Sequence, residues 1–296
     1  MTALERSRAK LLAFRLGVTA ALTLGAGVIL VRAAGAGGGA GVEAADTPSV
    51  VDRMSEAGAA YLATLDGAAR ERGSWSLDAD ARYDWHFVPR EREGMPLEDM
   101  TTEQRSAAHT LLQSVLSGQG YLKATGVMTL EGALGVIEGR PERRNPQDYY
   151  FSLFGEPSPD APWAWRFEGH HISMNFTSAP GGLPSVTPAF IGSNPHVVGE
   201  GPLAGWRLLG GEEDRMRDLL AALGPDLETA RIADAAPDDI VTGNARRVEI
   251  DGYEGMRVSD MTPEQHQALM LLLEQFLENA ADEIADAEMD RIHAAG

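Results

Sequence analysis

Apolar residues recur three and four positions apart in several segments of the chain, which is the spacing that gives an amphipathic helix one buried face. This spacing predicts helices at residues 49–72, 121–138 and 212–223, a short helix at 227–232, and a long closing helix at 262–292. These helices are separated by segments with a different pattern, so the chain is expected to contain both helices and sheet.

Alternation of apolar and polar residues, typical of strands, marks residues 80–89, 149–154, 163–177 and 248–253. The second and third of these are joined by a turn with three prolines, which predicts an antiparallel hairpin. Residues 180–202 are rich in Gly and Pro and are expected to form a long loop of the kind that often carries function. The element order predicts an α+β fold with a central, mostly antiparallel sheet and peripheral helices.

One signature occurs twice, 161 positions apart: MPLEDMTTEQ at residues 95–104 and MRVSDMTPEQ at 256–265. In both copies a Thr and a Gln three residues later form the capping box that starts a helix. Capping alone does not require the Met and Asp residues that the copies share. The repeat therefore predicts an internal duplication about a pseudo-twofold axis, and the alternative is two helices with a common capping signature.

The first 44 residues have the plan of an export signal. A basic stretch precedes an uncharged apolar run at residues 16–31, and Ala and Gly fill residues 33–41. The run suits a cleaved signal peptide or, if extended toward roughly 20 residues, an uncleaved membrane anchor. Either alternative places the protein outside the cytoplasm, periplasmic or secreted, with membrane contact only through this segment. Residues 45–296 are expected to form a single α+β domain.

Charge and composition exclude several classes of function for this protein. The chain carries a net charge of −19, and the first 43 residues carry +3, which leaves −22 on the remainder. A domain with this much negative charge repels the phosphate backbone of a nucleic acid, so we expect no nucleic-acid partner. The absence of Cys excludes disulfides, thiolate zinc sites and Cys nucleophiles.

The densest group of chemically capable side chains lies in residues 163–177, WAWRFEGHHISMNFT. In a regular strand, Arg166, Glu168 and His170 share one face, whereas His171, Ser173 and Asn175 share the other. Adjacent His residues then point to opposite sides and cannot bind one metal ion, unless a bulge at Gly169 redirects one of them.

Three interpretations follow from this stretch. Glu168 and His170 form an acid/base pair or bind a divalent metal such as zinc, with Arg166 holding an anionic group. Alternatively, the polar row on the other face binds a ligand by hydrogen bonds, or all these groups are structural. The candidate residues are Glu168, His170, His171, Arg166 and Asn175 for catalysis, Ser173 and Asn194 for ligand binding, and His170 and His171 for a metal.

Several short motifs together carry a family resemblance: W-x-F-x-P at residues 85–89, the two DMT-x-EQ helix starts, W-x-W-R-x-E-GHH-x-S-x-N at 163–175 and TP-x-F-x-G-x-NP at 187–195. Over residues 49–278 the chain resembles domain of unknown function family 3500. The resemblance implies a mostly exported group without an assigned reaction.

Two function classes remain open from the sequence. The first is an extracytoplasmic enzyme, a hydrolase acting on a small molecule or polymer with or without a divalent metal. The second is a non-catalytic ligand- or metal-binding protein of the cell envelope.

Overall fold

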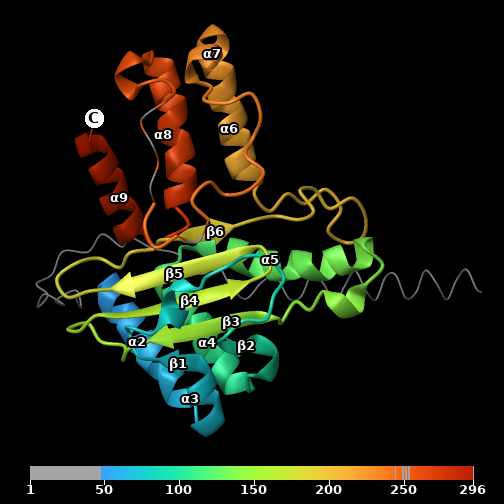
Figure 1. Cartoon of the computed structure of the whole chain (residues 1–296), viewed down its shortest axis with the longest axis vertical. Helices are drawn as coiled ribbons and strands as arrows, with labels where there is room; N and C mark the ends of the chain where they lie inside the picture. Colours follow the sequence, from blue (N-terminus) through green and yellow to red (C-terminus); the bar gives the residue numbers. More distant parts are fainter. Residues whose placement is uncertain (1–47, 244, 249, 251, 253, 296) are drawn as a thin grey trace, which may run out of the picture. The chain divides into compact units, whose positions relative to one another are not determined.

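A six-stranded sheet forms the centre of the described chain (Figure 1). The computed structural model describes residues 48–295 except 244, 249, 251 and 253. The strand order is β1 (Ser74–Trp75), β3 (Tyr149–Phe154), β4 (Trp163–Gly169), β5 (Ile172–Ser178) and β6 (Ala189–Ile191), with β2 (Met95–Pro96) also paired to β3. Only the β1–β3 pair is parallel, so the sheet is mixed and mostly antiparallel. The α+β prediction is confirmed.

The helices match most of the predicted positions. They are α2 (Val50–Thr64), α3 (Gly67–Gly73), α4 (Thr102–Val115), α5 (Gly118–Ile137), α6 (Gly210–Leu223), α7 (Leu227–Ala230), α8 (Pro263–Leu277) and α9 (Asp282–Ala295). Short 3₁₀ turns are η1 (Asp80–Tyr83), η2 (Leu97–Asp99), η3 (Pro141–Arg143), η4 (Gly224–Asp226) and η5 (Val258–Asp260). The helix predicted at 49–72 breaks between α2 and α3.

The prediction of a single closing helix at residues 262–292 is wrong, because this segment forms two separate helices, α8 and α9. Ala280, between them, forms a β-bridge with Leu116, and the backbone N–H of Ala281 donates to the carbonyl of Val115 at 2.9 Å. These bonds hold the chain extended where an unbroken helix would have placed its own hydrogen bonds.

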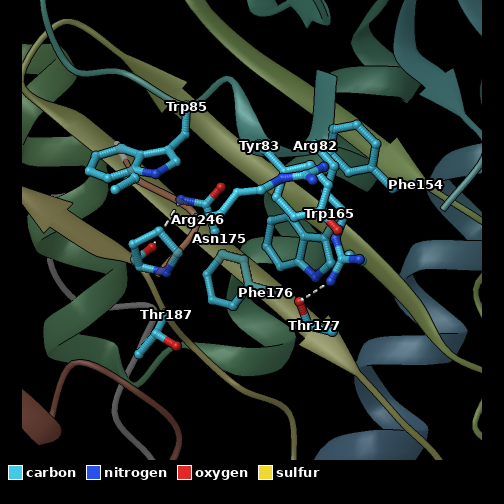
Figure 2. Close-up of a pocket in the computed structure, with 13 residues that line it drawn as sticks. Arg82, Tyr83, Trp85, Phe154, Trp165, Asn175, Phe176, Thr177, Thr187 and Arg246 are labelled. Atoms are coloured by element: carbon cyan, nitrogen blue, oxygen red, sulfur yellow. Dashed lines mark hydrogen bonds between the residues drawn. The ribbon is translucent and has the colours of Figure 1, made fainter. Parts of the chain in front are cut away.

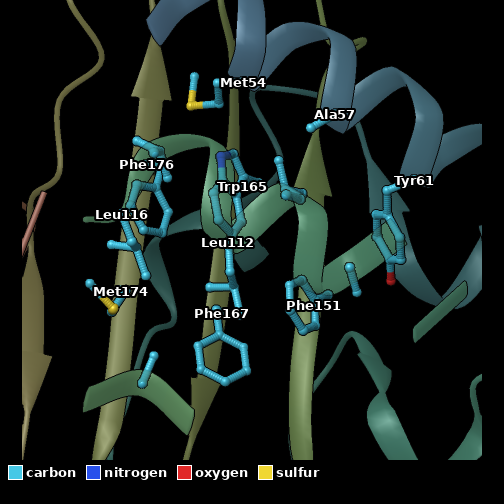
Figure 3. Close-up of a cluster of buried hydrophobic side chains, with 14 of the residues drawn as sticks. Met54, Ala57, Tyr61, Leu112, Leu116, Phe151, Trp165, Phe167, Met174 and Phe176 are labelled. Carbon is cyan, nitrogen blue, oxygen red and sulfur yellow. The ribbon is translucent and has the colours of Figure 1, made fainter. Parts of the chain in front are cut away.

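The main core lies between one face of the sheet and helices α2 and α4 (Figure 3). Met54 and Tyr61 of α2 and Leu112 of α4 are fully buried there. They face aromatic side chains of β3 and β4, including Phe151 and Trp165. Each such side chain contributes about 1.5–3 kcal/mol through burial, so this layer fixes the position of the central strands.

Residues 163–177 are not one strand, as predicted, but two. The two-residue turn His170–His171 joins β4 to β5, and Gly169 pairs with Ile172 across it. His171 adopts the left-handed region with φ of 63°. The predicted pairing of 149–154 with this segment is confirmed as the antiparallel β3–β4 ladder.

The strand predicted at 80–89 is also wrong, because this segment is η1 followed by an irregular stretch. Its backbone carbonyls bond to the β4–β5 hairpin and do not form the ladder of a strand. Arg166 donates to the carbonyl of Ala81, and the carbonyl of Phe87 accepts from the His171 N–H. The predicted strand at 248–253 is not a strand at the residues of it that the structure describes.

The predicted signal or anchor at residues 1–44 lies outside the described residues. Within the described part of the chain, no helix combines the length and the apolar character needed to cross a bilayer.

Candidate functional site

The tight turn at His170–His171 determines which of the predicted site residues share a face of the sheet. In the β4–β5 register, Glu168 pairs with Ser173 and Arg166 with Asn175. Directly paired residues lie on one face, so these four side chains stand together, opposite the aromatic core. The sequence interpretation assumed one strand and placed Arg166 and Glu168 on one face and Ser173 and Asn175 on the other, which is wrong.

Arg166 and Glu168 form a buried ion pair beneath the irregular segment after η1. Arg166 Nε lies 2.8 Å from Glu168 Oε1, and both side chains are at most 2% exposed. The other carboxylate oxygen, Oε2, accepts the backbone N–H of His86 at 3.1 Å and lies 4.0 Å from Arg92 Nε. Arg166 also donates to the carbonyl of Arg82 at 3.3 Å. Oε1 therefore meets Arg166 in an ion pair without forming a hydrogen bond, whereas Oε2 accepts one from the His86 N–H.

Burial governs the titration of this cluster. Burial raises the pKa of Glu168, although the Arg166 guanidinium and the His86 N–H oppose the rise by favouring the carboxylate. Burial also lowers the pKa of Arg166 and of Arg92, with Glu168 acting in the other direction. A buried carboxyl group held between two guanidiniums, without an open face, is poorly placed to exchange a proton with a substrate.

The two His residues lie in a separate cluster at the end of the hairpin. His170 Nδ1 lies 2.6 Å from Glu131 Oε2 of α5, and the two imidazole rings are 4.0 Å apart. Arg144 Nη1 approaches the same Nδ1 at 3.2 Å. Burial, followed by the charge of His170, lowers the pKa of His171 to about 4. Glu168 and His170 are thus not the facing acid/base pair that the sequence predicted.

The His cluster does not suit a divalent metal. His170 Nδ1 is already bonded to Glu131, and the guanidinium of Arg144 beside it repels a cation. Across the residues that the structure describes, no group of three or more His, Asp or Glu side chains is arranged to hold a metal ion. We derive no metal chemistry for this site.

Asn175 lies at a different place, in a pocket of about 200 Å³ on the outer face of the sheet (Figure 2). Its side-chain amide donates to the carbonyl of Pro188 at 2.9 Å and to Ser173 Oγ at 3.3 Å. The amide oxygen remains available as an acceptor. The pocket is lined by Arg82, Tyr83, Trp85, Phe154, Ala164, Trp165, Asn175, Phe176, Thr177, Thr187, Pro188, Ala245 and Arg246.

Two guanidiniums define the chemistry of this pocket. Arg246 stacks on the ring of Tyr83, 3.6 Å from its centroid, and its side chain is 61% exposed. Arg82 lies 5.5 Å from the same centroid and donates to Thr177 Oγ1 at 3.2 Å. Stacking of both on one aromatic ring restricts them while leaving N–H groups for a ligand. We call this the Arg82–Arg246 pocket.

Sequence reasoning missed most of this pocket. Arg82 and Tyr83 fall in the segment predicted as a strand, and Arg246 lies more than 160 positions further along the chain. A sequence signal existed for part of it, because Thr187 and Pro188 belong to the TP-x-F motif. Asn194 of the same motif is exposed in the loop after β6 and does not line the pocket.

The comparisons with known proteins identify the family. Residues 47–295 match the family described as Protein of unknown function (DUF3500), and the chain belongs to this family. The resemblance found in the sequence motifs is thereby confirmed. No curated protein and no solved structure matches the chain.

Proposed function

We propose that this chain is an extracytoplasmic, non-catalytic binding protein that holds a small carboxylate in the Arg82–Arg246 pocket. The observation that carries the proposal is the pair of guanidiniums stacked on Tyr83 beside the amide of Asn175. Guanidinium groups bind carboxylates through two parallel hydrogen bonds, and the neighbouring rings offer an apolar surface to the ligand body. Export rests on the pattern of the first 44 residues alone.

Local charge supports an anionic ligand although the whole protein is acidic. Among the described residues, two guanidiniums, those of Arg82 and Arg246, and no carboxylate line the pocket, and Asp80 approaches Arg246 at 3.6 Å. The pocket region therefore has an excess of positive charge. Arg166 contributes by holding the carbonyls of Ala81 and Arg82, which positions the η1 segment.

The same geometry argues against the hydrolase alternative at this strand. Glu168 is 1% exposed, and His170, in the turn of the hairpin, is bonded to Glu131. Neither group lines the pocket that contains Asn175. A general base must reach the proton that it removes, directly or through one water molecule.

Benzoate and benzamide provide the direct test, because they share shape and differ in charge. Calorimetric titration of the full-length protein is expected to show benzoate binding at least tenfold more tightly than benzamide. Arg246→Gln should weaken benzoate binding at least tenfold, whereas Arg231→Gln, at an exposed Arg that does not line the pocket, should leave it unchanged. Equal affinity for the two compounds would refute the proposal.

The duplication also enters as a proposal, supported by element order. Helix pair α2/α4 is matched by α6/α8, and η2 and η5 precede the second helix of each pair. The first helix of each pair contains Asp-Arg-Met, at residues 52–54 in α2 and 214–216 in α6. The separation of these two copies is close to the 161 residues that separate the repeats at 95–104 and 256–265. Ser117 Oγ donates to the carbonyl of Glu278, so residues 161 positions apart meet, as a pseudo-twofold axis at this point requires.

A further inference from the structure

A second cavity lies between strands β5 and β6 and helices α8 and α9. Its volume is about 870 Å³, within the range of about 300–1,000 Å³ typical of small-molecule sites. Most of its walls are apolar, with contributions from Met174, Phe190, Ile191, Phe276, Leu277 and Ile284. Figure 1 shows α8 and α9 standing beside β6. We call this space the α8–α9 cavity.

The cavity lies at the break between α8 and α9. Ala280, in the break, pairs with Leu116 at the end of α4 and lines the cavity. The chain is held extended at this point, so α8 and α9 form separate walls and not one continuous helix. The deepest lining residues are almost inaccessible to water, since Met174 is 1% exposed, Ile284 3% and Ala280 7%.

The cavity runs along one face of α9. Four residues of this helix line it, at a spacing that places them on a common face: Ile284, Ala285, Glu288 and Arg291. Ile284 and Arg291 are seven positions apart, so the lined face is about 10 Å long. Exposure rises along it, from 3% at Ile284 to 65% for the side chain of Arg291. The cavity therefore has a closed end and an open end, which suits an elongated molecule.

The charges in the lining are compensated within the protein. Glu288 and Arg291 form an ion pair with each other at the open end. Glu212, the third charged lining residue, is paired with the ammonium group of Lys123. The other polar lining residues are uncharged: Ser185, Thr187 and Asn279. Hydroxyl and amide groups can each donate or accept a hydrogen bond. The described lining therefore favours neither an anionic nor a cationic head group.

The first helix pair shows what the corresponding surface contacts when it is covered. By the 161-residue spacing of the repeat, Val115 of α4 corresponds to Phe276 of α8, and Leu116 corresponds in the same way to Leu277. Val115 and Leu116 are buried in the main core, where Leu116 belongs to one cluster with Phe176 (Figure 3). Phe276 and Leu277 line the cavity instead, and Phe276 is 54% exposed. The cavity thus leaves uncovered a surface whose counterpart is covered by apolar side chains.

We propose that the α8–α9 cavity binds a molecule with a single hydrocarbon chain. The apolar tip of the chain lies at the closed end, against Met174 and Ile284, and the polar head lies at the open end near Arg291. The chain covers Phe276, as apolar side chains cover Val115 in the first helix pair. Burial of each methylene group tightens binding about fourfold. Chain length, and not head-group charge, therefore sets the affinity.

The proposal does not depend on the function assigned to the Arg82–Arg246 pocket. That pocket has a volume of about 200 Å³ and is lined by two guanidiniums, whereas the α8–α9 cavity has about 870 Å³ and mostly apolar walls. Thr187 lines both, so the segment between β5 and β6 forms a wall common to the two. An uncharged alcohol tests the cavity and benzoate tests the pocket, so the failure of either proposal is recognised separately.

Three alcohols test the proposal on the full-length protein: hexan-1-ol, octan-1-ol and decan-1-ol. Calorimetric titration is expected to show one saturable site per chain, with affinity rising about 16-fold for each added pair of methylene groups. Decylamine and decanoate, below their micelle concentrations, should each displace decan-1-ol with an affinity within about fivefold of its own at about 0.15 M salt. Absence of saturable binding, or affinity that follows head-group charge and not chain length, would overturn the proposal.

Two variants locate the site. Ala285→Phe fills the cavity from α9 and should weaken decan-1-ol binding at least tenfold, whereas Ala60→Phe, on the exposed face of α2, should leave it unchanged. Phe276→Ala removes a half-exposed wall and should weaken binding at least fivefold, whereas Leu122→Ala, at an exposed side chain of α5, should not. Circular dichroism checks that each variant is folded. Unchanged decan-1-ol affinity in folded Ala285→Phe or Phe276→Ala protein would overturn the proposal.

Discussion

Arg166 and Asn175 lie directly opposite each other on β4 and β5, on the face of the sheet turned away from the aromatic core. The two-residue turn between the strands brings this about. Across such a turn, an even-numbered residue of β4 pairs with an odd-numbered residue of β5, and paired residues lie on the same face of the sheet. The guanidinium then supports the η1 segment from below while the amide lines the pocket. The two residues serve one site in different ways, one by positioning and one by contact.

Replacement of Glu168 by Gln should destabilise the protein strongly. The change leaves Arg166 and Arg92 buried without a counter-charge, and removal of one partner from a buried ion pair typically costs about 3–5 kcal/mol. Urea unfolding at pH 7 measures the loss. The exposed Glu93→Gln serves as the control and should change stability by less than about 0.5 kcal/mol. A Glu168→Gln protein with unaltered stability would contradict the structural role assigned to this carboxylate.

Gly169 should not tolerate even a methyl group. A Cβ at this position would lie 2.3 Å from the ring of Tyr149, whose hydroxyl also donates to the carbonyl of His170. Gly169→Ala is expected to cost about 1–3 kcal/mol, because the ring has to move within a packed core. The matched change Gly67→Ala, at the start of α3 with no atom within 4 Å, should be neutral or stabilising by about 0.4–1 kcal/mol. Similar denaturation midpoints for the two variants would count against the described packing.

His171 should make stability depend on pH between about 6.5 and 4. Its pKa in the folded protein is lowered to about 4, so the unfolded chain binds the proton more readily. Stability from this group is therefore complete above pH 6.5 and is lost as the pH falls toward 4, by about 2–3 kcal/mol. His171→Asn keeps a residue suited to φ of 63° and removes the titration. The variant should show a shallower loss of unfolding free energy between pH 7 and 4.5, and parallel curves would contradict this.

Gln104 and Gln265 should have equivalent effects if the two helix pairs are related. Each closes a capping box, with its side-chain oxygen accepting from the N-cap backbone at 2.9 Å. Each also donates across to the partner helix region, Gln104 to the carbonyl of Thr64 and Gln265 to Asp226. Replacement of either by Ala should cost about 1–2 kcal/mol. Thermal unfolding measures both, and a large cost at one position with none at the other would argue against equivalent roles.

The sequence predicted the class of fold because periodicity and capping are local signals. The capping boxes at Thr101 and Thr262 and the strand at residues 149–154 needed only neighbouring residues to be recognised. The hairpin turn at His170–His171 was missed because the stretch lacks the Asn-Gly or Gly-Gly pair that usually marks a two-residue turn. That single omission reversed the faces of every residue after Gly169.

The site could be predicted only in part for a related reason. Asn175 was correctly chosen as a residue to examine, since its side chain does line a pocket. Arg82 and Arg246 are brought together by the tertiary fold, and no spacing in the sequence connects them. Glu168 looked available for chemistry because sequence alone does not reveal that Arg92 and the His86 N–H would close around it.

The central claim is that a ligand carboxylate is held by Arg82 and Arg246 beside Asn175. Calorimetric titration of benzoate into the full-length protein and into the Arg82→Gln/Arg246→Gln double variant, at 50 and 200 mM salt, tests it most directly. The unmodified protein should bind benzoate saturably, with lower affinity at higher salt because the attraction is electrostatic. The double variant should show no saturable binding at either salt concentration. Benzoate binding that survives the loss of both guanidiniums, or that is absent from the unmodified protein, would contradict the account.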